Sequence, residues 1–197
     1  MDVRRAGPAQ VPAIRTVLAR ALAGDPLFAW FFPRGREPEE RRLSRIALYL
    51  APQIDWMVAA STAHVALTGG DVVGAALWLD PDLTRPDTLP AMDDLAEILM
   101  DGPTARASRS GMRAARDGAP RVEGDYLAML AVVPDMQGRG VGSRLLAPAL
   151  GRGPGTRWLE TTNPRNIPFY ERAGFRVIHD AQINDSGVRL IRMAGEF

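Results

Sequence analysis

Apolar residues recur at helical spacing early in the chain. Between residues 8 and 23 they fall on one helix face: Val11, Ile14, Val17, Leu18 and Leu22. This spacing predicts an amphipathic helix, preceded by a short strand at Val3-Arg4. A second helix is expected over residues 39–60. An aromatic cluster bounded by prolines, residues 25–33, separates the two helices.

The middle of the chain changes from a strand pattern to a helical one. Residues 64–67 and 72–79 are apolar and are joined by Thr68-Gly69-Gly70-Asp71, which predicts a β-hairpin. From Pro81 to Pro120 the pattern is helical, with a break at Asp101-Gly102-Pro103.

Residues 126–133 form a continuous apolar run that Pro134 ends. Such a run suits a strand buried on both faces, so we expect it at the centre of the sheet. A helix that begins within the following turn is marked by Leu145, Leu146, Ala149 and Leu150, and Pro148 should kink or shorten it. Strands at 157–162, 175–179 and 188–193 and a short helix at 168–172 complete a mixed sheet of α/β or α+β class. Gly174 is expected to end that short helix in a left-handed conformation.

Length and composition indicate one globular domain, residues 1–197. A net charge of +1 gives no reason to expect nucleic acid or membrane binding. The N-terminus has no apolar segment of the signal-peptide kind, so the cytoplasm is the expected compartment. Absence of Cys excludes thiolate chemistry, and two isolated histidines, His64 and His179, suggest no metal site.

Every basic side chain is arginine, because the sequence contains no Lys. This excludes a P-loop lysine, a Schiff-base lysine and a serine–lysine hydrolase. One row of arginines has helical spacing: Arg106, Arg109, Arg113 and Arg116. A solvated helix face is the favoured interpretation of this row, ahead of an anion or acyl-carrier site.

A glycine-rich turn directly follows the apolar run, with the sequence Gln137-Gly138-Arg139-Gly140-Val141-Gly142-Ser143. Glycines let the backbone approach a ligand, and the free N–H groups of a helix's first turn attract anions, so a pyrophosphate fits here. Arg139 could contact a further phosphate. A plain tight turn is one alternative. A dinucleotide fingerprint is another, but Ser143 replaces its third glycine and the turn lies past mid-chain.

Two motifs resemble the GNAT acetyltransferases. The first is a strand followed by Val-Pro-Asp, then Gln-x-x-Gly-x-Gly, then a helix. This order is similar to the acetyl-CoA signature of that superfamily. A second motif runs from Leu159 through Asn166 and Tyr170 to Gly174-Phe175. Together they cover about residues 125–178. Within the superfamily, the run Leu-Glu-Thr…Pro-Arg-Asn-x-Pro-Phe-Tyr-Glu-Arg-x-Gly-Phe is most similar to the puromycin N-acetyltransferase group.

The resemblance implies a mostly antiparallel sheet flanked by helices and split beside the cofactor strand. It also implies an N-acetyltransferase that uses acetyl-CoA. Cofactor contacts are then expected from Ala131, Val132, Val133, Gln137, Gly138, Arg139, Gly140, Val141, Gly142, Ser143, Asn166 and Phe169. Tyr170 corresponds to the family's tyrosine at the thioester sulfur.

Amine acetylation needs a proton acceptor, because an alkylamine with a pKa near 10.4 is almost fully protonated at neutral pH. Glu160, at the end of a strand beside the cofactor strand, is the first candidate base, with Glu123 and Asp125 as alternatives. A backbone N–H near Val132 could stabilise the oxyanion. Tyr170 is expected to donate a hydrogen bond to the departing sulfur; its alternative role is a core aromatic.

The acceptor side is less defined. Trp30 and Phe31, with Phe32, form an aromatic wall for the acceptor or anchor the N-terminal helices in the core. We expect a small-molecule primary amine, such as an antibiotic or aminonucleoside, as acceptor, and a monomer or homodimer. Alternatives are a protein amine acetyltransferase, for which an acidic groove would be needed, and a non-catalytic acyl-CoA-binding or dinucleotide-binding module.

Overall fold

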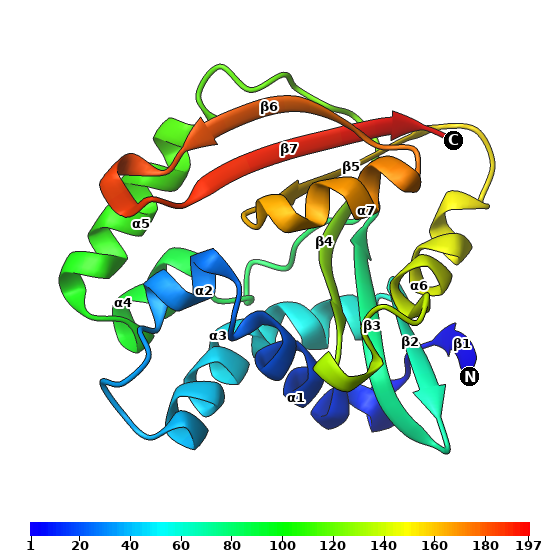
Figure 1. Ribbon diagram of the computed structural model, residues 1–197, viewed down its shortest axis with the longest axis horizontal. Coiled ribbons are helices and arrows are strands. Elements are labelled where there is room, and N and C mark those ends of the chain that lie inside the picture. The colour runs from blue at the N-terminus through cyan, green and yellow to red at the C-terminus, as the bar shows by residue number, and fades with distance from the viewer.

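The computed structural model describes residues 1–197 as a seven-stranded sheet flanked by helices (Figure 1). The strands follow the order β1-β2-β3-β4-β5-β7-β6 across the sheet. Their bounds are β1 Asp2–Arg5, β2 Ala63–Thr68, β3 Asp71–Leu79, β4 Asp125–Val132, β5 Thr156–Thr161, β6 Arg176–Gln182 and β7 Arg189–Glu196. Only β4 and β5 pair in parallel, and all other neighbours are antiparallel. This topology confirms the mostly antiparallel sheet and excludes the parallel sheet of a dinucleotide-binding fold.

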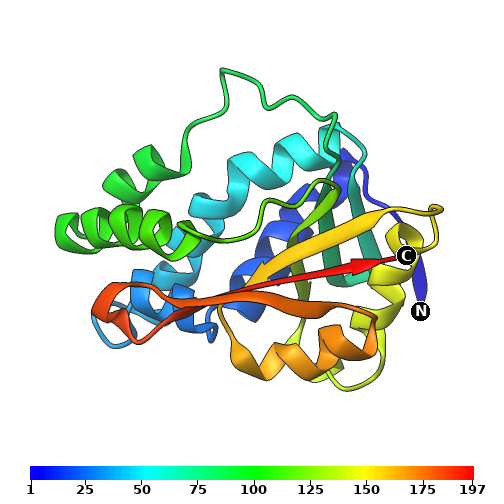
Figure 2. The same ribbon diagram turned by 90° about the horizontal axis from the view of Figure 1, so that it is seen from above.

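Helices cover both faces of the sheet. Their bounds are α1 Val11–Leu22, α2 Pro26–Phe31, α3 Glu39–Ala59, α4 Met92–Leu99, α5 Gly102–Arg116, α6 Val141–Leu150 and α7 Ile167–Arg172. α1 and α3 pack with β2 to β4 in the larger apolar core, and α6 and α7 pack on the opposite face (Figures 1 and 2). None of these helices combines the length and apolarity needed to cross a bilayer.

Most predicted elements are present, with three corrections. The aromatic cluster contains a helix, α2, which begins at Pro26 because Asp25 caps it through a hydrogen bond from Leu27 N. Residues 81–91 are not helical. Gly102 and Pro103 begin α5, with Asp101 as its N-cap, so the predicted break is a helix start.

β4 is the fourth of seven strands, as expected for the apolar run, but it is only partly buried. Its residues Ala128, Met129 and Leu130 pack against the two apolar cores and also line a cavity. Apolar residues that line a cavity and apolar residues of a core give the same hydrophobic pattern, so the sequence alone does not distinguish them.

The two parallel strands separate after a short pairing. β4 and β5 are in register only from Asp125 opposite Arg157 to Leu127 opposite Leu159. Beyond Leu127, β4 continues to Val132 without a partner on this side. Figure 1 shows the consequence, because β5 and β7 run nearly across the direction of β3 and β4. The predicted split beside the cofactor strand is therefore present.

Arg42 organises the N-terminal helices from inside the core. Its side chain is fully buried; Nε donates to Phe32 O at 2.6 Å and Nη2 to Ala23 O at 2.5 Å. Nη1 pairs with Glu39 at 2.9 Å. These contacts tie the ends of α1 and α2 to α3, which holds the segment between α1 and α2 in place.

Replacement of Arg42 by Met should lower the free energy of unfolding by about 3 kcal/mol, because two buried carbonyls lose their donors. The melting temperature should fall by about 6–12 °C in a chain of this size. The neighbouring Arg41, whose side chain is 77% exposed, is the control: Arg41→Met should change stability by less than about 0.5 kcal/mol. Equal urea midpoints for the two variants would contradict this role.

Candidate active site

The glycine-rich turn connects the free end of β4 to α6. Gly138 and Gly140 have φ of +72° and +75°, and nothing lies within 4 Å of a Cβ built at either position. Glycine adopts this left-handed conformation without the steric cost that other residues incur. A Cβ at Gly142, by contrast, would lie 3.0 Å from the ring of Phe169, so this glycine lets α7 pack against the start of α6.

The amide hydrogens of this turn are free. No N–H from Gly138 to Ser143 is donated to another group of the protein, and the first donor of α6 is Arg144 N, at 3.2 Å from Gly140 O. Most of these residues are exposed. Several free N–H groups at a helix N-terminus form an anion site. Residues Gly138 to Ser143 therefore have the geometry that a pyrophosphate requires.

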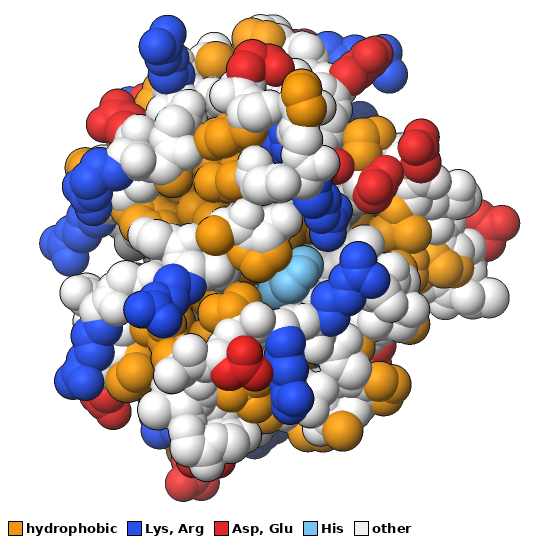
Figure 3. Space-filling view, turned by 90° about the vertical axis from the view of Figure 1, so that its right-hand side faces the viewer, with side chains coloured by type: hydrophobic (Ala, Val, Ile, Leu, Met, Phe, Trp, Pro, Cys, Tyr) orange, Lys and Arg blue, Asp and Glu red, His pale blue; other side chains and the backbone are white.

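Unpaired arginines surround this anion site. Arg139 and Arg144 have no acidic partner within salt-bridge distance. The face of the molecule that carries α6 and both chain termini has arginine side chains distributed among apolar ones (Figure 3). Positive potential near the turn favours a ligand with several phosphates.

Backbone groups of the free β4 edge point into the split. Val133 N donates to Val73 O on β3 at 2.9 Å, so the antiparallel register directs Ala131 to β3 as well. Val132 faces the opposite way, toward the split, where its carbonyl accepts a hydrogen bond from Gln137 Nε2 at 2.9 Å. Of Ala131, Val132 and Val133, which are predicted to contact the cofactor, only Val132 presents its backbone to the split.

A cavity of about 610 Å³ passes through this split. Its walls come from both layers of the molecule: residues 126–130 of β4, the end of β5, Tyr170 of α7, and residues of α2 to α5. The segment between Pro81 and Pro120 contributes α4 and α5 to one wall. The cavity therefore lies between β4, β5 and α7 on one side and the helices α2 to α5 on the other.

Tyr170 lies between the two layers. Its side chain is buried, packs edge-on against Phe169 and Phe175, and borders the cavity. Burial and the nearby charge of Asp25 raise its pKa above that of a free tyrosine. The hydroxyl consequently stays protonated at neutral pH and is available as a hydrogen-bond donor. Asn166 also borders the cavity and donates to Thr161 Oγ1 at 3.3 Å.

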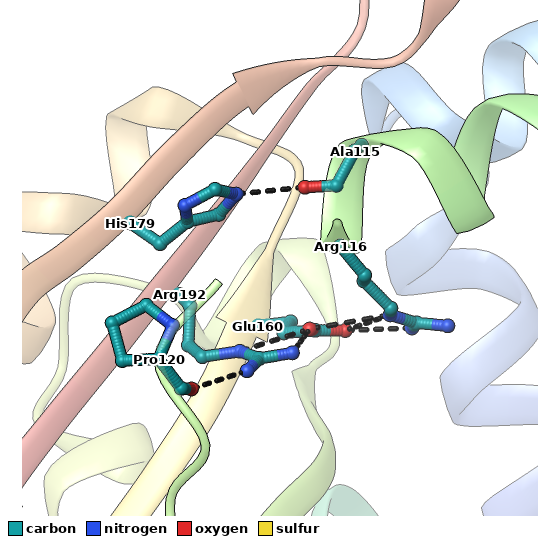
Figure 4. Close-up of polar contacts among 6 residues, drawn as sticks. All are labelled: Ala115, Arg116, Pro120, Glu160, His179 and Arg192. Carbon is teal, nitrogen blue, oxygen red and sulfur yellow. Dashed lines mark hydrogen bonds and ion pairs between the residues drawn. The ribbon is translucent and has the colours of Figure 1, made fainter. Parts of the chain in front are cut away.

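Glu160 is held by two arginines from different elements. Arg116 of α5 bonds to it at 2.6 Å and Arg192 of β7 at 2.7 Å (Figure 4). Burial alone would raise the pKa of Glu160, but the hydrogen bonds and charges of these arginines outweigh it and lower the pKa. A carboxylate in this state is a weak proton acceptor. The geometry thus argues against the base role expected for Glu160.

The same network fixes α5 to the sheet. Arg192 also donates to Pro120 O at 2.7 Å, and a ring nitrogen of His179 lies 2.7 Å from Ala115 O (Figure 4). Both contacts bind the end of α5 or the loop after it. Glu160 is therefore best described as the anchor of the helix that forms the cavity wall.

Asp25, a residue that the sequence did not single out for chemistry, borders the cavity beside Tyr170. Its Oδ1 accepts hydrogen bonds from Leu27 N at 2.9 Å and from Thr162 Oγ1 at 2.7 Å. Burial raises the pKa of Asp25, and the hydrogen bonds from Thr162 and Leu27 only partly offset this effect. Two reasons explain why the sequence does not single out Asp25. An aspartate at a helix N-cap has an ordinary structural role, and its contact with Thr162, 137 positions away, depends on the fold.

The aromatic residues divide between core and cavity. Phe31 borders the cavity together with Phe28 and Tyr49, and burial raises the pKa of Tyr49 to about 12. Trp30 does not line it; its ring packs on Phe31 at 5.3 Å. Phe31 therefore lines the cavity, whereas Trp30 packs beside it; contact of Phe31 with the acceptor stays a prediction.

Comparison with known proteins agrees with this geometry. Residues 109–177 match the family described as the acetyltransferase (GNAT) domain. The peptidyl-lysine N-acetyltransferase YjaB of Salmonella typhimurium is 32% identical over 65 residues, which are 32% of this chain and 45% of that protein. The chain thus spans less than half the length of this curated relative.

Solved structures match over nearly the full chain. One is described as histone acetyltransferase HPA2 and related acetyltransferase from Corynebacterium glutamicum; it is 28% identical, with a TM-score of 0.65 and coverage of 98% of this chain and 94% of that one. The polyamine N-acetyltransferase of Drosophila melanogaster shares the fold, with 19% identity, a TM-score of 0.62 and coverage of 100% and 99%.

The fold combines a split sheet with a candidate anion site at the free end of β4. Residues 109–177 are thus similar to GNAT acetyltransferase domains, and the fold of the whole chain is similar to that of a solved acetyltransferase.

Replacement of Glu160 by Gln should destabilise the fold by about 2 kcal/mol at neutral pH, since Arg192 loses its buried partner. A lowered folded-state pKa means that this contribution is present above the carboxyl's ordinary pKa and is lost as pH falls through the lower folded value. The difference in unfolding free energy between wild type and variant should therefore be constant above about pH 5 and shrink below about pH 4. Urea titrations across this range test it, and a difference that grows toward acid would contradict it.

Proposed function

We propose that the protein transfers an acetyl group from acetyl-CoA to the primary amine of a small molecule. The observation that carries the proposal is the run of free amide hydrogens from Gly138 to Ser143 at the end of a strand whose edge is unpaired. A pyrophosphate fits those amides, and an extended arm fits the edge at Val132. When bound, acetyl-CoA supplies the acetyl group as an activated thioester.

Asp25 is the residue best suited to accept the amine's proton. Its pKa is raised, it borders the cavity, and its charge acts on Tyr170. A base with a raised pKa is closer to the value that efficient proton transfer needs. Glu160, with a lowered pKa and two arginine partners, is the weaker candidate.

Two further groups support the acyl transfer. The N–H of Val132 faces the split and can donate to the oxyanion that forms on attack. Tyr170 can donate a hydrogen bond to the departing sulfur. Full proton transfer from Tyr170 is unfavourable, because its pKa lies above that of a tyrosine while a thiol titrates near 8.5.

A small-molecule acceptor is favoured over a protein. The cavity is closed on one side by α4 and α5, and its apolar walls suit a compact substrate more than an extended peptide. Proteins of similar fold are described as acting on polyamine and agmatine, and the second motif resembles the puromycin N-acetyltransferase group. The similarity to a peptidyl-lysine acetyltransferase makes a lysine peptide a necessary arm of the test.

The protein should release thiol from acetyl-CoA in the presence of at least one member of an amine panel that includes puromycin, arylalkylamines, agmatine and a lysine peptide. Acetyl-CoA, and not NAD, should raise the melting temperature. Stabilisation without turnover of any amine would indicate a non-catalytic module. Absence of stabilisation by acetyl-CoA would contradict the proposal.

Asp25→Asn isolates the base in the same assay. Asn caps helices as well as Asp and keeps an acceptor for Leu27 and Thr162, so the variant should fold. Its kcat/KM should fall about 10²- to 10⁴-fold, and the acidic limb of the pH profile, expected above the ordinary Asp pKa, should disappear. Glu160→Gln, assayed where it is folded, should keep that limb. If Asp25→Asn kept the acidic limb and Glu160→Gln lost it, the base would be Glu160 and not Asp25.

A further inference from the structure

The cavity contains six charged side chains, and most of them are already paired. They are Asp25, Asp93, Arg109, Arg113, Arg116 and Glu160. Arg109 binds Asp93 at 3.1 Å and Glu97 at 2.6 Å. Arg116 and Arg192 both bind Glu160, so this carboxylate is fully paired.

Two charged groups of the cavity have no partner of opposite sign. Asp25 is bonded only to neutral groups, the Thr162 hydroxyl and the Leu27 amide. The side chain of Arg113, one turn after Arg109 on α5, forms no ion pair or hydrogen bond; it is exposed at the mouth of the cavity, where it also borders a second hollow on the outer side of α5. The cavity therefore offers one free carboxylate and one free guanidinium to whatever enters it.

These two unpaired charges limit which acceptor molecules the cavity can bind. On the proposed function, Asp25 interacts with the reacting amine, which leaves no unpaired acidic group for a second cation. A free guanidinium instead selects a carboxylate, to which it can donate two parallel hydrogen bonds. The charge pattern disfavours polyamines and favours an amine with an anionic group.

The uncharged side chains of the cavity indicate the shape and polarity of the rest of the acceptor. Phe28, Phe31 and Tyr49 line the chamber, and Tyr126 borders it with its ring stacked on Trp158 at a centroid distance of 4.2 Å. Aromatic walls of this kind bind a planar or bulky apolar group.

We propose that the acceptor is an aromatic amine that also carries a carboxylate, and that Arg113 binds this carboxylate. The inference rests on the proposed function, since it concerns the acceptor of the same acetyl transfer. Arg113 would be a specificity-determining residue without a part in the chemical step. It lies on α5, within the helical segment between β3 and β4.

Matched acceptors test the proposal: L-phenylalanine against phenethylamine, and 4-(aminomethyl)benzoic acid against 4-methylbenzylamine. The two pairs present the carboxylate near to and far from the amine. For at least one pair, the acid should have the higher kcat/KM, and Arg113→Gln should reduce the ratio of acid to amine about tenfold, through KM. Comparing ratios between wild type and variant cancels differences in amine basicity. Agmatine should be the poorest acceptor.

Arg106→Gln is the matched control, because Arg106 lies on the same helix and does not line the cavity; it should leave both ratios unchanged. Arg113→Lys should restore part of the preference, since it keeps the charge but not the paired donors. If amines are acetylated but Arg113→Gln leaves both ratios unchanged, or agmatine is the best acceptor, the carboxylate inference is overturned while the proposed function stands. If no amine is acetylated, the proposed function itself fails.

Discussion

The separation of β4 from β5 after Leu127 is the constraint on which the rest of the structure depends. A strand inside a sheet normally has partners on both sides, and unpaired backbone groups away from water cost free energy. Here the edge from Ala128 to Val132 has no partner strand, and its first part, Ala128 to Leu130, borders a cavity. An extended ligand that pairs with this edge would satisfy those groups, as an added strand does.

The two layers of helices contribute different parts of the candidate site. On one side, the turn before α6 exposes amide hydrogens to an anion; on the other, α2 to α5 enclose an aromatic chamber. Asp25 and Tyr170 lie where the layers meet. The Glu160 network holds α5 against β5 and β7, so the wall of the chamber is tied to the same strand that borders the split.

Local signals were sufficient for much of this molecule. The apolar run, the glycine-rich turn and the second motif predict the central strand, the anion site and α7, because strand burial, positive φ and helix capping depend on nearby residues. The helix α2 was missed, since its aromatic residues resemble core anchors and its start depends on a single cap at Asp25.

Site chemistry depended on residues far apart in sequence. Glu160 is a reasonable base by position, but its partners Arg116 and Arg192 lie 44 and 32 residues away, and they decide its pKa. Asp25 becomes a candidate only when the fold brings it to Thr162 and Tyr170. The orientation of Val132, opposite to Ala131 and Val133, likewise requires the register with β3.

The most direct test of the central claim is amide hydrogen exchange of the free protein and of its complex with acetyl-CoA. We expect the ligand to slow exchange in two segments above all others, residues 138–143 and the β4 edge up to Val132, since both gain hydrogen-bond acceptors. Unchanged exchange in both segments, with acetyl-CoA bound elsewhere, would contradict the claim that the split and its free amides are the cofactor site.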